Sequence, residues 1–351
     1  MSFEIIALKS DGISTEIMEP ALEVLRAVMA GEVEIHEEYS VGGISIDNCG
    51  DPLTDETLDA CQRSDGVLLV AVGGPKWDHL DLSKSPEAAL LGLRKRMGKD
   101  GLYANLRPVK PLPALYDASP IRRELIEGTD VLIVRESAGG AYFGRKTKTS
   151  DKGSDLWEYT TSEVERVARV AFGAAKTKVA SADKANVLAS GQQWREAVGA
   201  LHQREFPHIE LTNVLADNAA MQLIDESRKF EVILTENTFG DILSDVGAKI
   251  TGSIGMLPSI TLGAEDDPFL AEPVHGSAPD IAGQGSANPL ATFLSIALMC
   301  RHGFKREAQA SAIEAAVERA INSGLRTPDL GGNNSTKHAA KTVMRELVKL
   351  V

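Results

Sequence analysis

Two aspartates one helical turn apart have the spacing in this chain that most directly suggests chemistry. Asp241 and Asp245 follow an apolar run at 230–234. We expect a helix there, capped by Asn237 or Thr238, with both carboxylates leaving one face. Such a pair could hold Mg²⁺ or Mn²⁺, which prefer oxygen ligands. The alternatives are a solvated face or an acidic first turn that the helix dipole favours.

Four basic residues recur near the ends of expected helices and strands. They are Arg94, Arg107, Arg135 and Lys184. Three arginines meeting at one site would suit a dicarboxylate, because a guanidinium grips a carboxylate through two parallel hydrogen bonds. Strand ends are also where open α/β sheets bind ligands. A surface ion pair is the alternative for each arginine, and the spacing leaves open whether they meet.

Lys184 and two further residues are candidates for proton transfer or metal binding. Lys184 could act as a base if burial and a nearby cation lowered its pKa; a salt bridge to Asp183 is the alternative. Tyr142, in a glycine-rich turn, could donate a proton or could simply pack. Asp217, which follows an expected strand, could be a third metal carboxylate or a helix cap.

The elements that must position these residues alternate between strand and helix. Continuous apolar strands in such an order predict a largely parallel sheet covered by helices on both faces. Strands are expected at 3–8, 33–39, 66–72, 102–109, 131–134, 178–182, 209–215 and 230–234. Helices are expected at 11–28, 55–62, 85–96, 162–175, 191–205, 238–252, 289–300, 306–322 and 335–350. The polar stretch at 145–155 is expected to be an exposed loop or arm.

Length and charge narrow the function. The chain has 351 residues, of which 43% are hydrophobic and 25% charged, so it can form a large core, with two lobes. Its formal net charge of −13, without a long basic run, argues against nucleic-acid and anionic-membrane partners. A small anionic ligand would therefore require arginine and lysine to be concentrated in one pocket.

The cysteines and the N-terminal sequence favour a cytoplasmic protein. Cys49, Cys61 and Cys300 are odd in number and form no C-x-x-C pair, which is typical of thiols in a reducing compartment. The first residues show no leader-peptide pattern. The longest apolar run, 67–72, is too short to span a bilayer.

Several common catalytic and nucleotide-binding motifs are missing from the sequence. No G-x-G-x-x-G follows an expected strand, and G-x-x-x-x-G-K-[ST] does not occur. H-E-x-x-H and G-x-S-x-G do not occur either. A standard dinucleotide-binding fold and a P-loop therefore have little support.

Five motifs together carry a resemblance to a known family. They are Asn-Leu-Arg-Pro at 105–108, Gly-Ala-Tyr-Phe-Gly at 140–144, Asp-Lys-Ala-Asn-Val at 183–187, Phe-Gly-Asp-Ile-Leu-Ser-Asp at 239–245 and His-Gly-Ser-Ala-Pro-Asp-Ile-Ala-Gly at 275–283. In this order, over nearly the whole chain, they resemble the β-decarboxylating dehydrogenases that act on isocitrate and isopropylmalate. The resemblance implies a non-Rossmann α/β fold in two domains. The first, 1–101 and 253–351, would hold both termini and the NAD-binding loops; the second, 102–252, would hold the dimer interface, the arm and the metal carboxylates.

The resemblance also implies a reaction and an assembly. A homodimer would bind NAD, Mg²⁺ or Mn²⁺ and a dicarboxylate in a cleft between the domains. It would convert 3-isopropylmalate to 4-methyl-2-oxopentanoate, a step of leucine biosynthesis, with reduction of NAD. The family binds its dinucleotide without the usual glycine fingerprint, which agrees with its absence from this sequence.

The resemblance assigns roles to individual residues. Lys184 and Asp217 would reach the active site of the other subunit, Lys184 as the base and Asp217 as a metal ligand beside Asp241 and Asp245. Tyr142 would protonate the enol that remains after CO₂ leaves. The implied substrate-binding residues are Arg94, Arg107, Arg135, Glu87, Leu90, Leu91 and Val187. The implied NAD-binding residues are His275, Gly276, Ser277, Ala278, Asp280, Ile281 and Asn288.

Two of these groups bear on selectivity. Leu90 and Leu91 precede Arg94 by four and three residues, so they would form an apolar wall beside it and favour a branched alkyl group over a third carboxylate. Both leucines could instead belong to the core of an amphipathic helix. Asp280 would accept hydrogen bonds from a ribose hydroxyl and repel a 2′-phosphate, which predicts NAD over NADP.

Two segments depart from the family pattern. Ser10, Ser14 and Thr15 lie in a turn that is richer in glycine in the family and close to its cofactor. Ser137-Ala138 stands where isopropylmalate enzymes usually have Leu-Thr, which could enlarge the pocket or make it more polar. The open alternatives are therefore the same chemistry on homoisocitrate, isocitrate, tartrate, D-malate or a longer 3-alkylmalate, and a non-catalytic regulatory subunit. The complete set of metal, base and acid residues argues against the regulatory subunit.

Overall fold

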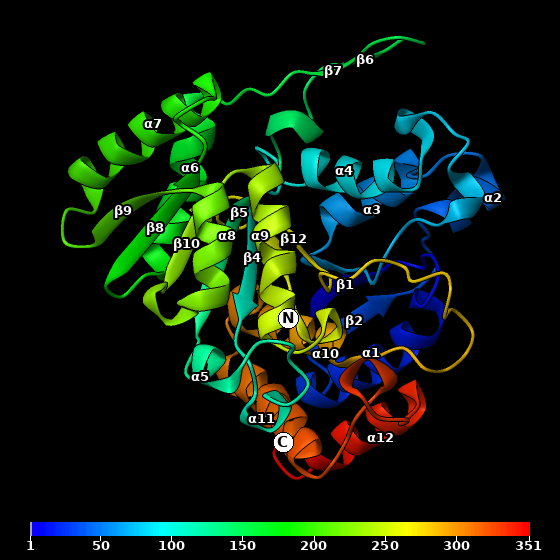
Figure 1. Cartoon of the computed structure of the whole chain (residues 1–351). Coiled ribbons are helices and arrows are strands. Elements are labelled where there is room, and N and C mark those ends of the chain that lie inside the picture. Colours follow the sequence, from blue (N-terminus) through cyan, green and yellow to red (C-terminus); the bar gives the residue numbers. More distant parts are fainter. Residues whose placement is uncertain (1) are drawn as a thin grey trace. The chain divides into compact units, whose positions relative to one another are not determined.

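The computed structural model describes residues 2–351 and divides the chain into two compact units. Unit 1 comprises Met1–Leu102 and Gly252–Val351, and unit 2 comprises Tyr103–Thr251. Each junction lies one residue from the boundary expected from sequence. Each unit has its own strands and covering helices (Figure 1).

Unit 1 is built on a mostly parallel set of strands. These are β1 Phe3–Ala7, β2 Val33–His36, β3 Gly66–Leu68, β11 Ile260–Leu262 and β12 Phe269–Ala271. Their order is β2-β1-β3-β12-β11, and the β11–β12 pair is antiparallel. The helices are α1 Ser14–Met29, α2 Gly43–Cys49, α3 Asp55–Arg63, α4 Glu87–Arg96, α10 Leu290–Leu298, α11 Glu307–Asn322 and α12 Thr336–Leu347.

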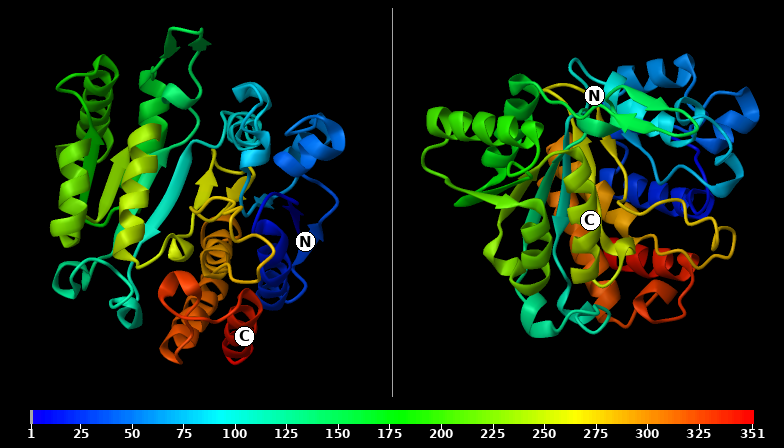
Figure 2. Two further views of the ribbon diagram at one scale, coloured as in Figure 1. Left: turned by 45° about the vertical axis from the view of Figure 1, so that its right-hand side comes forward. Right: turned by 45° about the horizontal axis from the view of Figure 1, so that its top comes forward.

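The helices of unit 1 bury the apolar sides of its strands. Leu58 of α3 and Leu93 of α4 are buried in one cluster with Ile6 of β1, Val67 of β3 and Leu270 of β12. On the other side, α1, α10, α11 and α12 pack against one another (Figure 1, Figure 2). Burial of both faces explains why β3 and the part of β1 after Glu4 read as continuous apolar runs.

Unit 2 repeats this design around the central segment of the chain. Its strands are β4 Ala104–Val109, β5 Val131–Glu136, β8 Lys178–Asp183, β9 Glu210–Leu215 and β10 Val232–Thr235, in the order β4-β5-β10-β8-β9. The β4–β5 pair is antiparallel and the other pairs are parallel. The helices are α5 Arg123–Ile126, α6 Thr161–Ala174, α7 Ala189–Glu205, α8 Ala216–Asp225 and α9 Asn237–Ile250.

The helices of unit 2 form two pairs. Helices α6 and α7 pack together on one face of the strands, and α8 and α9 pack together on the other (Figure 1). A separate hairpin, β6 Lys146–Lys148 and β7 Gly153–Asp155, extends away from the strands of this unit. The polar stretch expected as a loop or arm is therefore a two-stranded arm with exposed residues.

Several short elements were not predicted from the sequence. Helices α2 and α8 and strands β11 and β12 were not predicted, and β3 ends at Leu68 instead of continuing to residue 72. Helix α10 ends at Leu298 and passes into a π turn, Met299–Gly303, instead of ending at Cys300. The start of α2 depends on a distant residue, because the Asp11 carboxylate accepts the N–H groups of Gly43 and Ile44 at 2.7 and 2.8 Å. Among residues 2–351, every helix is too short or too polar to cross a membrane.

Candidate active site

Helix α9 of unit 2 presents the aspartate pair, and its start is fixed by a carboxylate. The cap is Glu236, whose side chain accepts the N–H groups of Thr238 and Phe239. The expectation that Asn237 or Thr238 caps the helix was therefore wrong. A glutamate at this position can reach two orphan N–H groups at once, and its negative charge suits the helix N-terminus.

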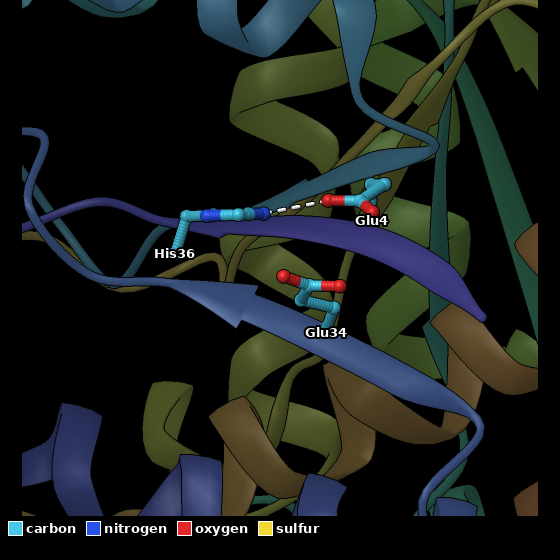
Figure 3. A group of neighbouring side chains, drawn as sticks. All are labelled: Glu4, Glu34 and His36. Carbon is cyan, nitrogen blue, oxygen red and sulfur yellow. Dashed lines mark hydrogen bonds and ion pairs between the residues drawn. The ribbon is translucent and has the colours of Figure 1, made fainter.

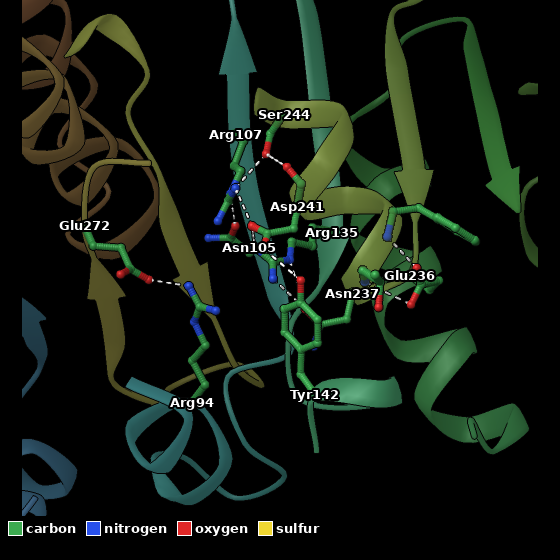
Figure 4. Close-up of polar contacts among 12 residues, drawn as sticks. Arg94, Asn105, Arg107, Arg135, Tyr142, Glu236, Asn237, Asp241, Ser244 and Glu272 are labelled. Carbon is green, nitrogen blue, oxygen red and sulfur yellow. Dashed lines mark hydrogen bonds and ion pairs between the residues drawn. The ribbon is translucent and has the colours of Figure 1, made fainter. Parts of the chain in front are cut away.

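Asp241 is the centre of a polar cluster in unit 2 (Figure 4). Its Oδ1 atom accepts hydrogen bonds from Arg135 and, at 3.3 Å, from Nη1 of Arg107. Its Oδ2 atom accepts a hydrogen bond from the Tyr142 hydroxyl at 3.0 Å. Two of the three predicted arginines and the predicted proton donor therefore meet at one predicted metal carboxylate.

Asp245 lies one turn further along α9. Burial of its carboxylate and the negative charge of Asp241 both raise its pKa, against the opposing effect of Arg107 and Arg135. The two carboxylates therefore repel each other in this structure. A hard divalent cation between them would remove that repulsion, so the donor set fits Mg²⁺ or Mn²⁺.

Neighbouring polar residues hold the Arg107 guanidinium in place. Its Nε donates to the Asn105 side chain, and its Nη1 donates to the Ser244 hydroxyl at 2.6 Å. Arg107 is 4% exposed, so these bonds take the place of lost hydration. On the other side of the cluster, a Cβ at Gly240 would lie 2.5 Å from Cγ of Arg135. Only glycine lets the Arg135 side chain cross α9 at that point.

Tyr142 keeps its proton at neutral pH. Burial and the negative charge of Asp241 raise the pKa of the phenol to about 12. The Tyr142 ring also lies 5.6 Å from the Arg135 guanidinium, a cation–π distance. The predicted alternative, a tyrosine that only packs, does not account for the bond from its hydroxyl to a carboxylate.

Lys184 and Asp217 are paired with each other. Nζ of Lys184 lies 2.7 Å from Oδ1 of Asp217, and the hydrogen bond from Lys184 lowers the pKa of Asp217. Asp183, the alternative partner considered from sequence, instead binds Arg195 of α7 at 2.7 Å. That alternative was wrong. Asp217 lies in the first turn of α8 and is not the residue that caps it.

The predicted substrate residues of unit 1 lie on α4. Nη2 of Arg94 forms a buried ion pair with Oε1 of Glu272 at 2.6 Å, while its buried Nε has no hydrogen-bond partner among residues 2–351. Leu90 is partly exposed and packs against the unit 1 core, and Leu91 is also partly exposed. Glu87 is exposed, and Val187, in unit 2, is 67% exposed.

The predicted NAD loop of unit 1 combines buried anchors with exposed backbone. His275 is buried, which lowers its pKa and keeps the imidazole neutral. Its Nδ1 donates to the Gly276 carbonyl at 3.0 Å, and its buried Nε2 has no partner within the described chain. Gly276 and Asp280 are exposed, and Ala278 has a φ of +40°. An unpartnered acceptor beside exposed backbone fits a bound cofactor.

Other residues hold this loop in place. The Asn288 side chain donates to Asp329 at 2.9 Å and accepts the N–H of Leu290 at the start of α10. Ala278 and Ile281 pack against an apolar cluster that includes Ile17. The carbonyl of Ser277 accepts the N–H of Ile13 at 2.9 Å.

The residues that depart from the family pattern have local partners. The Ser14 hydroxyl donates to the Ala71 carbonyl and accepts the Ala71 N–H, both at 3.2 Å, and Thr15 donates to the Gly12 carbonyl. The buried Ser10 hydroxyl has no partner among the described residues. Ser137 and Ala138 are both buried.

One other group of side chains in residues 2–351 has the spacing of a metal site. Glu4 of β1 and Glu34 and His36 of β2 face the same side of these paired strands (Figure 3). Nε2 of His36 lies 2.6 Å from Glu4, and this hydrogen bond raises the pKa of His36. A cross-strand hydrogen bond between the partly exposed side chains of Glu4 and His36 accounts for the contact, so we assign no metal to it.

Several residues of the site were missed from sequence. They are Asn105, Glu236, Asn237, Ser244 and Glu272, each of which holds a predicted site residue or its helix. Asn105 is two residues before Arg107 on one strand, so its place on the same side of that strand was detectable. The pairing of Glu272 with Arg94, 178 positions apart, was not.

The fold and this site define a class of enzyme. The chain belongs to the isocitrate/isopropylmalate dehydrogenase family, whose sequence model matches residues 4–347. A 3-isopropylmalate dehydrogenase of Heyndrickxia coagulans is 50% identical over 340 residues, which cover 94% of this chain and 91% of that protein. One from Oleidesulfovibrio alaskensis is 48% identical, with 98% of each chain covered.

Solved structures agree with the fold. The crystal structure of isocitrate dehydrogenase from Methylococcus capsulatus superposes with a TM-score of 0.87 at 29% identity, covering 99% of both chains. A β-decarboxylating dehydrogenase from Thermococcus kodakarensis gives a TM-score of 0.79 at 34% identity, covering 99% of this chain and 96% of the other. The expected α/β fold with a mostly parallel sheet is therefore confirmed.

Proposed function

We propose that the protein is a 3-isopropylmalate dehydrogenase, which oxidises and decarboxylates 3-isopropylmalate to 4-methyl-2-oxopentanoate in leucine biosynthesis. The observation that carries the proposal is the Asp241 carboxylate, held by Arg107, Arg135 and Tyr142 one helical turn from Asp245. Relatives of that activity at about half identity, aligned over nearly their whole length, support the choice of substrate. NAD and Mg²⁺ or Mn²⁺ are the cofactors to which the residues are suited.

The chain contributes charge, orientation and proton transfer. Asp241, Asp245 and Asp217 would hold the cation, and the loop from His275 to Asn288 would hold NAD. When bound, the cation would supply stabilisation of negative charge on the substrate oxygen, and NAD would supply the hydride acceptor. The three predicted arginines would bind the malate carboxylates through charge-assisted hydrogen bonds.

Two residues of the chain would move protons. Lys184 would accept the proton of the substrate hydroxyl at Nζ, directly or through water, and the carboxylate of Asp217 would stabilise the ammonium that results. Tyr142 would protonate a carbon atom of the enol after CO₂ has left. Its raised pKa keeps the phenolic proton in place until that step.

The direct test is a substrate panel with NAD and Mn²⁺. We expect 3-isopropylmalate to give a higher kcat/KM than isocitrate, homoisocitrate, tartrate or D-malate. A preference for one of those acids would identify a different member of the same family. Failure to turn over any 3-substituted malate would contradict the enzyme proposal and favour a regulatory subunit.

We also propose a cytoplasmic homodimer. Met221 and Ile224 of α8 and Ile242 of α9 are 63%, 41% and 56% exposed, on two helices that pack together. Large apolar side chains gathered on one pair of helices are typical of a surface that a partner covers. The three cysteines are free thiols, which supports a reducing compartment.

Leu90 and Leu91 should select the side group of the substrate. Leu90→Ala and Leu91→Ala should lower kcat/KM clearly more for 3-isopropylmalate than for D-malate, because a buried methyl contributes about 0.8 kcal/mol and D-malate has no alkyl branch. Steady-state kinetics on both acids provide the measurement. Equal losses on the two substrates would show that the leucines support the core of unit 1 and do not contact the branch.

Asp280 should make the enzyme prefer NAD to NADP. It is exposed on the NAD loop, where its carboxylate can accept hydrogen bonds from a ribose but repels a phosphate. We expect kcat/KM for NAD to exceed that for NADP by at least about tenfold, which is about 1.4 kcal/mol. Asp280→Ala should lower the ratio of kcat/KM for NAD to kcat/KM for NADP. Comparable values for both cofactors in the wild type would contradict this role.

A further inference from the structure

Asn237 is a buried residue that links the start of α9 to the guanidinium of Arg135. Its side-chain oxygen accepts hydrogen bonds from Nε of Arg135 at 3.0 Å and from Nη2 at 2.7 Å. Arg135 also contacts Asp241, so the same guanidinium joins the amide to the metal carboxylate (Figure 4). Asn237 is 0% exposed and Arg135 is 2% exposed. Water therefore does not compete for these bonds.

Asn237 can act as a fixed support because two further bonds hold it. Its side-chain nitrogen donates to the Gly139 carbonyl at 2.9 Å, and its backbone N–H donates to the Tyr159 hydroxyl at 3.1 Å. The Tyr159 hydroxyl donates in turn to Glu236 at 3.3 Å, the carboxylate that caps α9. The amide therefore has one orientation: its oxygen must face Arg135, because its nitrogen is needed at Gly139.

Tyr159 ties the same assembly to the turn that carries Tyr142. A Cβ on Gly139 would lie 2.8 Å from Cε1 of Tyr159, and a Cβ on Gly140 would lie 2.3 Å from its hydroxyl oxygen. Gly140 also has a φ of +70°, which favours glycine. The turn and the start of α9 therefore both contact the buried side chain of Tyr159.

We propose that Asn237 is a positioning residue for substrate binding: its amide sets the plane of the Arg135 guanidinium without neutralising its charge. The inference rests on the proposed function, since it takes the ligand of Arg135 to be a malate carboxylate. A carboxylate at position 237 could accept the same two hydrogen bonds. Its negative charge would also neutralise the guanidinium charge of Arg135, which the substrate requires. The carboxylates of Asp241 and Glu236 already lie nearby.

Two substitutions separate orientation from charge. Asn237→Asp keeps the shape and the acceptor but adds a negative charge, and Asn237→Ala removes the acceptor. We expect both to raise KM for 3-isopropylmalate at least about tenfold while KM for NAD stays within about twofold. Mutating a purely structural residue would not change one KM and spare the other.

A destabilising control distinguishes this role from loss of stability. Thr129→Val removes a buried hydrogen bond of 2.6 Å between Thr129 and Ser227, elsewhere in unit 2. It should lower the melting temperature and leave both KM values unchanged. If Asn237→Asp and Asn237→Ala keep the wild-type KM for the acid, or raise both KM values together as their melting temperatures fall, the positioning role is wrong.

Crystal structures of the variants would show the orientation of the Arg135 guanidinium without any substrate. In Asn237→Ala the Arg135 side chain should adopt a different rotamer from the wild type. An unchanged guanidinium plane would overturn the inference. A wild-type enzyme that turns over no 3-substituted malate would contradict the proposed function, while the rotamer comparison would still decide whether Asn237 orients Arg135.

Discussion

Replacing Asp245 by asparagine should abolish turnover and at the same time stabilise the metal-free protein. We expect kcat/KM with Mn²⁺ to fall by at least about a thousandfold, because a catalytic cation supplies several kcal/mol and each 1.36 kcal/mol is tenfold in rate. The melting temperature in EDTA at pH 7 should rise slightly. Scanning calorimetry and steady-state kinetics on one preparation provide both measurements.

The sign of the stability change follows from the pKa of Asp245. Burial and the charge of Asp241 raise this pKa in the folded protein above its ordinary value of 3.8. The ionised carboxylate therefore lowers the free energy of unfolding at pH values above the pKa of the folded state. This destabilisation disappears as the pH falls through that pKa. The asparagine side chain of the variant carries no charge, so the advantage of Asp245→Asn should narrow towards acid pH. The rise is small because solvent screens a partly exposed carboxylate.

Asp241→Asn is the matched control, and its stability should change in the opposite direction. It should also abolish turnover, but Arg107 and Arg135, both buried, would lose an anionic partner, so the melting temperature should fall. Mn²⁺ should raise the melting temperature of the wild type only, because a ligand stabilises the state that binds it. A cation that stabilises Asp245→Asn as much as the wild type would exclude the aspartate pair as its site.

Local patterns were sufficient to predict most of the fold. The apolar runs of β1 and β5 and the helical periodicity of α6 are contained in single stretches of chain, so they were predicted to within a few residues. Strands β11 and β12 have only three residues each and pair with each other through long-range placement. A three-residue strand has no period to detect, which is why these strands were missed.

In the site, too, features set by nearby residues were predicted and features set by distant residues were not. The i, i+4 spacing of Asp241 and Asp245 predicted a shared helix face, and the structure has them on α9. The alternative considered for Lys184, an ion pair with its neighbour Asp183, was wrong, because Arg195 on the next helix binds the Asp183 carboxylate. Asp183 is the last residue of β8 and Lys184 lies just beyond the strand, so adjacency in sequence was a poor guide to this ion pair.

Mixed dimers should recover activity from two inactive parents if each site uses both chains. One parent carries Lys184→Ala and the other Asp245→Asn. If Lys184 serves the site of the opposite subunit, a mixed dimer has one site with both lesions and one site with neither. Random association gives half mixed dimers, so we expect roughly a quarter of the wild-type activity from an equal mixture. Each parent alone should be at least about a hundredfold less active than the wild type, the lower range for loss of an acid–base group.

The pairing of Lys184 with Asp217 supplies the matched control for this experiment. The two side chains are 2.7 Å apart in one chain, so they must serve the same site, whichever subunit that site belongs to. A mixture of Lys184→Ala with Asp217→Ala should therefore recover nothing, because every site in a mixed dimer carries one lesion. Both changes break an ion pair whose aspartate is 66% exposed, so both parents should fold. Recovery of activity in this control mixture would show that Lys184 and Asp217 of one chain do not serve the same site. No recovery in the first mixture, with mixed dimers verified by mass, would show that Lys184 acts within its own subunit.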